Sequence, residues 1–269
     1  MAKKRKIKKS MLVLAGIILF FIVYTSTYIY VSKKQQNDAP VKVEDNNLET
    51  DSSSLLSQMK TTNTVYISDK NLQDVRVEQE YWDQIKFFST KFKEVRKPSE
   101  YNSIYEGYLD NGIRFSTDLD YFRIYTVNKE EFYKIPVSEK KAFDKLLQES
   151  IYTSIDSVKK YKTWDSVEII YGDQVKKPWM WKYDDLAYKI SVKRLVGKIQ
   201  PEKSKERSPY NFTIKIKGDG YSITLDTMGK DYVKVTSDKA TAYYEVHEGL
   251  YEYLRDDIFK LEKTDNGSK

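Results

Sequence analysis

The sequence predicts an α+β protein in which one N-terminal transmembrane helix precedes an antiparallel-sheet domain with packed helices. Three observations support this prediction. Residues 11–31 form an uncharged, largely apolar run, several later segments alternate apolar and polar residues, and others repeat apolar residues every three or four positions. Strict alternation is typical of half-buried strands, whereas the longer spacing is typical of one helix face.

The N-terminal run is long enough to cross a bilayer. Its 21 residues, at about 1.5 Å per helical residue, span the ~30 Å hydrocarbon core. Six Lys and Arg side chains and no acids precede it within residues 3–9. By the positive-inside rule, residues 1–10 form a cytoplasmic tail and the C-terminal domain is extracytoplasmic, on a single-pass protein of the cell membrane. A cleaved signal peptide, with a loosely matching site at 25–27, and a buried helix of a soluble protein are the alternatives.

The rest of the chain divides by composition. Residues 32–63 are polar and predict a flexible linker, in which a short helical turn around Leu55, Leu56 and Met59 is the one alternative. A first α+β unit is predicted at 64–160, a second at 161–262, and a disordered tail at 263–269.

The first unit contains hairpin and helix signals. Asn111-Gly112 predicts a tight primed turn with positive φ at both residues, and Ser138 predicts a helix cap. Predicted strands cover 64–68, 103–109, 113–115, 121–126 and 131–135; one helix carries Tyr81, Ile85, Phe88 and Phe92, and a second carries Phe143, Leu147, Ile151 and Val158.

The second unit loosely repeats this order. Asp219-Gly220 matches Asn111-Gly112 at an offset of 108, and Asp231-Tyr232 matches Asp120-Tyr121 at an offset of 111. Two strand–helix–hairpin–strand–helix units would explain the matches. Predicted strands cover 167–171, 212–216, 221–225, 231–235 and 242–246, and a final helix carries Leu250, Leu254, Ile258 and Leu261. Residues 184–199 stay open, because their alternation favours a strand whereas the repeat requires a helix.

Charge and cysteine content exclude several classes of function. Beyond residues 1–9 the chain has 46 − 6 = 40 basic side chains against 40 acidic ones, whereas a domain that follows nucleic-acid phosphates carries a basic excess. We therefore expect no nucleic-acid partner. The chain has no cysteine, which excludes a disulfide framework, a zinc–thiolate site, a thiol nucleophile and a lipid-modified cysteine anchor.

No motif predicts catalysis, a metal site or a cofactor. The single histidine, His247, cannot form a multi-histidine metal site, and we expect it to be exposed where a strand passes into a helix. Neighbouring carboxylates do not by themselves provide the two distinct environments that acid–base chemistry needs. Such neighbours occur at Asp118 and Asp120, Asp184 and Asp185, and Asp256 and Asp257.

Two segments are candidates for binding. Residues 176–182 combine Trp179 and Trp181 with lysines, and exposed tryptophans of this kind can contact sugars, bilayers or proteins. Two tryptophans that flank a methionine are more often part of a core or a strand edge, which is the alternative. Residues 193–207 predict a basic loop, with Lys193, Arg194 and Lys198 as candidates for contact with anionic polymer or headgroups; a solvated loop is the alternative.

Residues 146–154, 196–203 and 227–235 resemble uncharacterised, membrane-anchored exterior-domain families of Bacillus-like Gram-positive bacteria. The architecture is also similar to the YycH/YycI class, single-pass proteins whose exterior domains restrain a sensor kinase. Neither resemblance implies a site residue.

The resulting expectation is a membrane-tethered, extracytoplasmic interaction or regulatory module without catalytic activity. Its partners would be membrane lipid, through residues 11–31, and another envelope protein. Two alternatives remain: an envelope enzyme that acts on wall glycan or polymer through scattered carboxylates, and a wall- or membrane-surface-binding module.

Overall fold

The computed structural model describes residues 54–205 and 211–261. The predicted cytoplasmic tail and transmembrane helix, residues 32–53 of the predicted linker, and the tail at 263–269 lie outside the described residues. Within the described ranges, no helix has the length and apolar character needed to cross a membrane.

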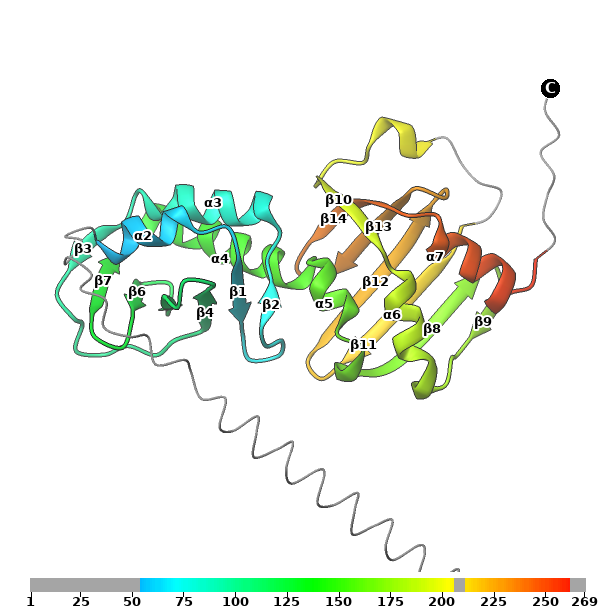
Figure 1. Ribbon diagram of the computed structural model, residues 1–269, viewed down its shortest axis with the longest axis horizontal. Coiled ribbons are helices and arrows are strands. Elements are labelled where there is room, and N and C mark those ends of the chain that lie inside the picture. The colour runs from blue at the N-terminus through cyan, green and yellow to red at the C-terminus, as the bar shows by residue number, and fades with distance from the viewer. Residues whose placement is uncertain (1–53, 206–210, 262–269) are drawn as a thin grey trace, which may run out of the picture. The chain divides into compact units, whose positions relative to one another are not determined.

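The described residues form an α+β structure with two antiparallel sheets of seven strands each (Figure 1). The first sheet has the order β2-β1-β4-β5-β6-β7-β3, and the second has the order β10-β14-β13-β12-β11-β8-β9. The first sheet consists of β1 (Val65–Ser68), β2 (Val75–Arg76), β3 (Lys93–Val95), β4 (Tyr105–Leu109), β5 (Arg114–Thr117), β6 (Tyr121–Tyr125) and β7 (Glu130–Lys134). The second consists of β8 (Trp164–Tyr171), β9 (Gln174–Lys176), β10 (Val192–Gly197), β11 (Thr213–Gly218), β12 (Tyr221–Met228), β13 (Tyr232–Ser237) and β14 (Thr241–Val246).

The two sheets share one topology. Starting from its β9 edge, the second sheet has the order β9-β8-β11-β12-β13-β14-β10. Subtracting seven from each number gives β2-β1-β4-β5-β6-β7-β3, which is the order of the first sheet. The helices correspond too: one lies between the second and third strands of each sheet, and another follows the seventh strand. The observed repeat is therefore more complete than the loose correspondence that the sequence predicts.

Three helices cover one face of the first sheet: α2 (Leu55–Thr61), α3 (Gln79–Ser89) and α4 (Val137–Tyr152) (Figure 1). The prediction of a flexible linker is wrong for residues 55–61, because Leu55, Leu56 and Met59 are buried on a helix. The indole N–H of Trp82 donates to the carbonyl of Thr62 at 2.8 Å, which ties the end of α2 to α3. A fully buried indole that gains this hydrogen bond stabilises the packing of the two helices.

Several helix boundaries differ from the prediction. The predicted helix at Tyr81 ends at Ser89, before Phe92, and the predicted C-terminal helix ends at Ile258, before Leu261. α4 begins at Val137 directly after Pro136, so Ser138 lies inside the helix and does not cap it. The chain then breaks at Thr153 and Ser154 before α5 (Ile155–Lys159), and Val158 belongs to this separate helix. Ser154 causes the restart, because its Oγ accepts a hydrogen bond from the backbone N–H of Asp156 at 3.1 Å.

The hairpin between β4 and β5 forms where predicted, but with another turn. Gly112 has φ +82°, whereas Asn111 is not among the residues with positive φ. The Gly112 N–H donates to the carbonyl of Leu109 at 3.1 Å, and the Leu109 N–H donates to that of Ile113 at 2.8 Å. These bonds define a three-residue loop that ends in one left-handed glycine, so only the second residue of the Asn-Gly pair needs positive φ.

Residues 184–199 contain both of the predicted alternatives. Most of the first half lies in α6 (Tyr183–Lys189), which follows η2 (Met180–Lys182), and the second half contains β10. The predicted C-terminal helix forms as α7 (Gly249–Glu252) continued by η4 (Tyr253–Ile258). α6 and α7 lie over one face of the second sheet (Figure 1), where Leu186 and Leu250 are buried. The connector from α5 to β8 is η1 (Tyr161–Thr163), and η3 (Glu202–Lys205) follows β10.

Replacement of Gly107 by alanine tests the packing of the first sheet. A Cβ at Gly107 would lie 2.3 Å from Cζ of Phe115, its cross-strand partner, and 2.7 Å from the carbonyl oxygen of Tyr66. We expect Gly107→Ala to lower the free energy of unfolding by about 1–3 kcal/mol, the usual range for overpacking a core. Urea denaturation measures the change.

Gly249→Ala is the matched control, because a Cβ there meets no atom within 4 Å. It removes a glycine from α7 and should change stability by less than about 1 kcal/mol, in the stabilising direction. Equal losses of stability in the two variants would contradict the packing described for Gly107.

Candidate functional site

Three consecutive large apolar side chains are exposed in the turn between β9 and α6. Trp179, Met180 and Trp181 expose 74%, 72% and 69% of their surface, and we call these three residues the tryptophan turn. The Lys182 N–H donates to the carbonyl of Trp179 at 2.8 Å and closes the turn. The exposure of Trp179 and Trp181 excludes their assignment to the core but not the strand-edge alternative, since the turn follows the edge strand β9. Binding by these two residues stays a prediction.

Nearby side chains take the core positions that the tryptophans leave. Tyr183 and Leu186 of α6 are buried, and the Tyr183 ring packs against Trp164 with centroids 5.5 Å apart. The helix is thus held by its own apolar face, and the preceding turn is free to carry side chains that the fold does not require. Large exposed aromatic residues of this kind are concentrated in binding surfaces.

The tryptophan turn has lysines on both sides, within a wider segment of mixed charge. Residues 174–183 contain three lysines and no acid, and Asp173, Asp184 and Asp185 flank this range. Lys182 Nζ lies 5.1 Å from the ring centroid of Trp181, and Lys177 Nζ lies 2.9 Å from Glu168 Oε1. Lys176 makes no ion pair within the described part of the chain. A partner that covers this turn would need an apolar centre and a neutral or acidic rim.

The three predicted basic residues do not lie in one exposed loop, and each forms an ion pair. Lys193 and Arg194 lie on β10, not in a loop, and their nitrogens are 3.8 Å and 2.8 Å from the two carboxylate oxygens of Glu245. Lys198 pairs with Glu149, a buried carboxylate of α4. Two carboxylates therefore face these three cations and balance their charge only in part, because Lys193 and Arg194 share Glu245. The pairing weakens the prediction that the three residues bind an anionic polymer.

The tryptophans and these cations do not form one site. The tryptophan turn follows β9, and Lys193 and Arg194 lie on β10, at the opposite edge of the second sheet. Seven strands place the two edges roughly 30 Å apart at ~4.8 Å per strand.

His247 is exposed, and the carboxylates that are neighbours in sequence make hydrogen bonds and ion pairs that stabilise local structure. His247 is exposed between β14 and α7, and its backbone N–H donates to the carbonyl of Ser191 at 2.9 Å. Asp118 Oδ1 accepts the backbone N–H groups of Asp120 and Tyr121 in a turn, and Asp184 Oδ1 accepts that of Asp185. Asp256 makes a two-point contact with Arg255. None of these carboxylates shares a described pocket with its sequence neighbour.

A buried carboxyl group joins the two sheets. Glu78, at the start of α3, places Oε1 within 2.9 Å of the Ile155 N–H and 3.0 Å of the Tyr244 hydroxyl on β14. The Tyr244 hydroxyl also donates to the carbonyl of Thr153 at 2.7 Å, and Ser154 Oγ lies 3.1 Å from Glu78 Oε1. We call Glu78, Thr153, Ser154, Ile155 and Tyr244 the buried junction.

The number of hydrogen-bond donors around Glu78 favours its neutral, protonated form. Each hydroxyl has one proton, and the shorter contacts of Tyr244 and Ser154 are to the backbone carbonyls of Thr153 and Arg76, at 2.7 Å and 2.8 Å. A protonated Glu78 can then donate to the Tyr244 oxygen, which leaves Oε2 as the one oxygen of this carboxyl group without a partner. Burial raises the pKa of Glu78 above its usual value of 4.5, although hydrogen bonds from Ile155, Tyr244 and Ser154 act in the opposite direction.

The buried junction borders a cleft of about 520 Å³, which Glu78, Glu80 and Asp156 line together with Arg76, Lys159 and Arg194. If the protein were an enzyme with two catalytic carboxylates, this cleft would be the place to expect them. However, Glu78 Oε2 has no accessible surface and no hydrogen-bond partner, and Asp156 accepts the Arg76 N–H at 3.0 Å and lies 3.4 Å from Lys160 Nζ. The arrangement therefore fits a structural role better than an acid–base pair.

Sequence reasoning missed the buried junction. Glu78 stands next to Gln79 and Glu80, a polar stretch that resembles an ordinary helix start, and Tyr244 lies 166 positions away. The Glu78 side chain does not cap its own helix, but this shows only in the structure. The sequence around Glu78 therefore contains no signal for the buried junction.

Comparison with known proteins adds no assignment: no protein-family model, curated protein or solved structure matches the chain. In residues 54–205 and 211–261, no group of three or more His, Cys, Asp or Glu side chains is arranged to hold a metal ion.

The raised pKa of Glu78 predicts a pH dependence of stability. A carboxyl whose pKa is higher in the folded state contributes stability that is fully present below its unfolded pKa, near 4.5, and is lost as pH rises through its folded pKa. Glu78→Gln cannot ionise, so it should remove this loss, which for one proton is at most about 1.4 kcal/mol per pH unit. Urea denaturation between pH 4.5 and 8 measures the slope.

Glu80→Gln is the control, since Glu80 is exposed and lies two residues away. It should keep the slope of the unmodified protein. A Glu78→Gln variant with an unchanged slope would show that Glu78 titrates normally in the folded state.

Proposed function

We propose that the described domain is a non-catalytic interaction module of the cell envelope, which docks a partner protein through the tryptophan turn. The observation that carries this proposal is the exposure of Trp179, Met180 and Trp181, three consecutive apolar residues that each expose about 70% of their surface. Burying two indoles and a thioether on a partner provides a large favourable free energy, and tryptophan is among the residues that most often dominate interfaces.

The surroundings of the turn support a protein partner. The β9 edge of the second sheet precedes it, with exposed Val175, so main-chain groups and apolar side chains are offered together. Lys177 is paired with Glu168, so Lys176 and Lys182 are the two lysines of residues 174–183 that would favour acidic groups on the partner. The carboxylates of Asp118, Asp184 and Asp256 make hydrogen bonds in turns or an ion pair, so they support the enzyme alternative less than the exposed tryptophans support docking.

The proposed location rests on the sequence. The predicted span at residues 11–31, with its basic N-terminal flank, would tether the domain on the outer side of the cell membrane. The proposed partner is then another envelope protein, in keeping with the resemblance to exterior domains of membrane-anchored Gram-positive proteins. A signalling or assembly component of the envelope fits this role.

Photo-crosslinking of the full-length chain in its own membranes tests the proposal. A photoreactive residue at position 180 should form an adduct with one protein. Trp179→Ala and Trp181→Ala should each lower its yield at least about tenfold, since truncation of a central aromatic anchor costs 2 kcal/mol or more. Phe87→Ala, which removes an aromatic ring that is 63% exposed on α3, is the control and should leave the yield unchanged.

The other outcomes separate the alternatives. Adducts with lipid alone would favour the membrane-surface module. A protein adduct that persists in both tryptophan variants, or no adduct at all, would contradict docking through the tryptophan turn.

A further inference from the structure

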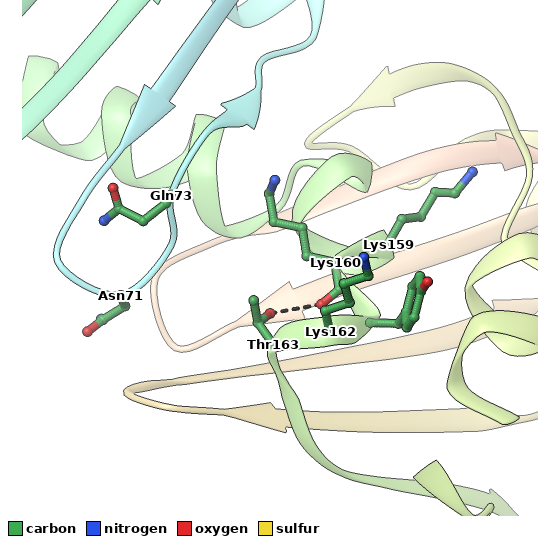
Figure 2. Close-up of a pocket in the computed structure, with 7 residues that line it drawn as sticks. Asn71, Gln73, Lys159, Lys160, Lys162 and Thr163 are labelled. Atoms are coloured by element: carbon green, nitrogen blue, oxygen red, sulfur yellow. Dashed lines mark hydrogen bonds between the residues drawn. The ribbon is translucent and has the colours of Figure 1, made fainter. Parts of the chain in front are cut away.

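A basic pocket lies at the connector between the two sheets, apart from the tryptophan turn. It has a volume of about 320 Å³. Lys159, Lys160 and Lys162 line it from the end of α5 and from η1, and Asn71 and Gln73 line it from the loop between β1 and β2 (Figure 2). Residues from both halves of the described chain therefore shape one pocket.

The backbone of the connector explains why the lysines are close together. α5 ends at Lys159, and the next turn is closed by the Thr163 N–H and hydroxyl, which both bond to the carbonyl of Lys160 at 2.8 Å (Figure 2). Three lysines therefore occupy four successive positions on tight turns. Residues 157–164 contain no acid, and Asp156 and Asp165 flank them.

The charges of this pocket are only partly balanced. Lys160 is held in place, because its Nζ donates to the carbonyl of Asp74 at 3.0 Å and lies 3.4 Å from Asp156 Oδ2. Lys159 and Lys162 make no ion pair within residues 54–205 and 211–261, and no carboxylate lines the pocket. Figure 2 shows the Lys159 side chain pointing away from that of Lys160. An anion that drew the unpaired ammonium groups of Lys159 and Lys162 together would relieve the positive potential of the connector.

The uncharged lining suits a group attached to the anion. Tyr161 lies between Lys160 and Lys162 and lines the pocket, and its hydroxyl makes no hydrogen bond within the described ranges. The walls are mainly apolar, as expected where lysine stems and an aromatic ring meet. A ligand with an anionic head and a less polar attachment would match both features.

We propose that this pocket binds a phosphate monoester or diester, with Lys159 and Lys162 paired to its oxygens and Tyr161 against the group that carries the phosphate. Ammonium–phosphate contacts are charge-assisted hydrogen bonds, which are stronger than neutral ones. The phosphate could belong to a soluble ester or to the headgroup of a lipid, since the recognised chemistry is the same. The site does not depend on the proposed docking through the tryptophan turn.

Binding of two probes to the full-length chain in detergent or in vesicles tests this proposal. Isothermal titration calorimetry with glycerol 1-phosphate represents the soluble source, and vesicles that contain phosphatidylglycerol, compared with phosphatidylcholine alone, represent the lipid source. The double variant Lys159→Gln/Lys162→Gln should weaken saturable binding of at least one probe by about tenfold or more, the effect of losing a charged hydrogen bond.

A matched control separates the pocket from the net charge. Lys141→Gln/Lys230→Gln makes the same change in charge at two lysines that have no ion pair within the described residues, and it should bind as the unmodified chain does. Unfolding midpoints should agree among the three proteins, because all four lysines are at the surface.

The outcomes are decisive in both directions. Loss with glycerol 1-phosphate supports the pocket and a soluble ester, and loss only with phosphatidylglycerol supports the pocket and a headgroup. Equal weakening in both double variants, or no saturable binding of either probe by the unmodified chain, would overturn the proposal. Trp179→Ala should leave phosphate binding intact, so failure of one proposal does not imply failure of the other.

Discussion

A single buried carboxyl group constrains how the two sheets of this protein meet. Glu78 stands where the cap of α3 would be, yet its Oε1 serves the N-terminus of α5, through Ile155, and the Tyr244 hydroxyl of the second sheet. The contacts of Oε1 favour this arrangement of the two sheets, because separating them would remove its bonds to Ile155 and Tyr244, whereas Oε2 has no partner in either case. The rest of the described structure is compatible with this contact.

The position of the basic pocket depends on a further contact between the sheets. Asn71 Nδ2 donates to the Tyr152 hydroxyl at 2.8 Å and to the carbonyl of Gly220 at 3.0 Å, so the loop between β1 and β2 is fixed against the second sheet. Gly220 is required there, since its φ is +74° and a Cβ would lie 2.5 Å from Asn71 Oδ1. Together with the buried junction, this contact holds the connector lysines in place and leaves the tryptophan turn exposed at the far edge of the second sheet.

The sequence predicts the parts of this structure that local patterns determine. Alternating strands such as β11 and β12, and the glycine of the Asn111-Gly112 turn, follow from side-chain spacing and from φ preferences. Strands of two or three residues, such as β2, β3 and β9, are too short to show a period. The buried junction was not predictable, because its geometry depends on residues far apart in the chain. The exposure of Trp179 could be proposed but not decided, since tryptophan is common both in cores and in interfaces.

A double-mutant cycle between Glu78→Gln and Tyr244→Phe tests the constraint most directly, with the free energy of unfolding measured at one pH for all four proteins. If the two side chains couple the sheets, the loss in the double variant should differ from the sum of the single losses by about 1 kcal/mol or more, as is usual for contacting residues in one network. Additivity within about 0.5 kcal/mol, the behaviour of independent sites, would show that the sheets are held together by other contacts.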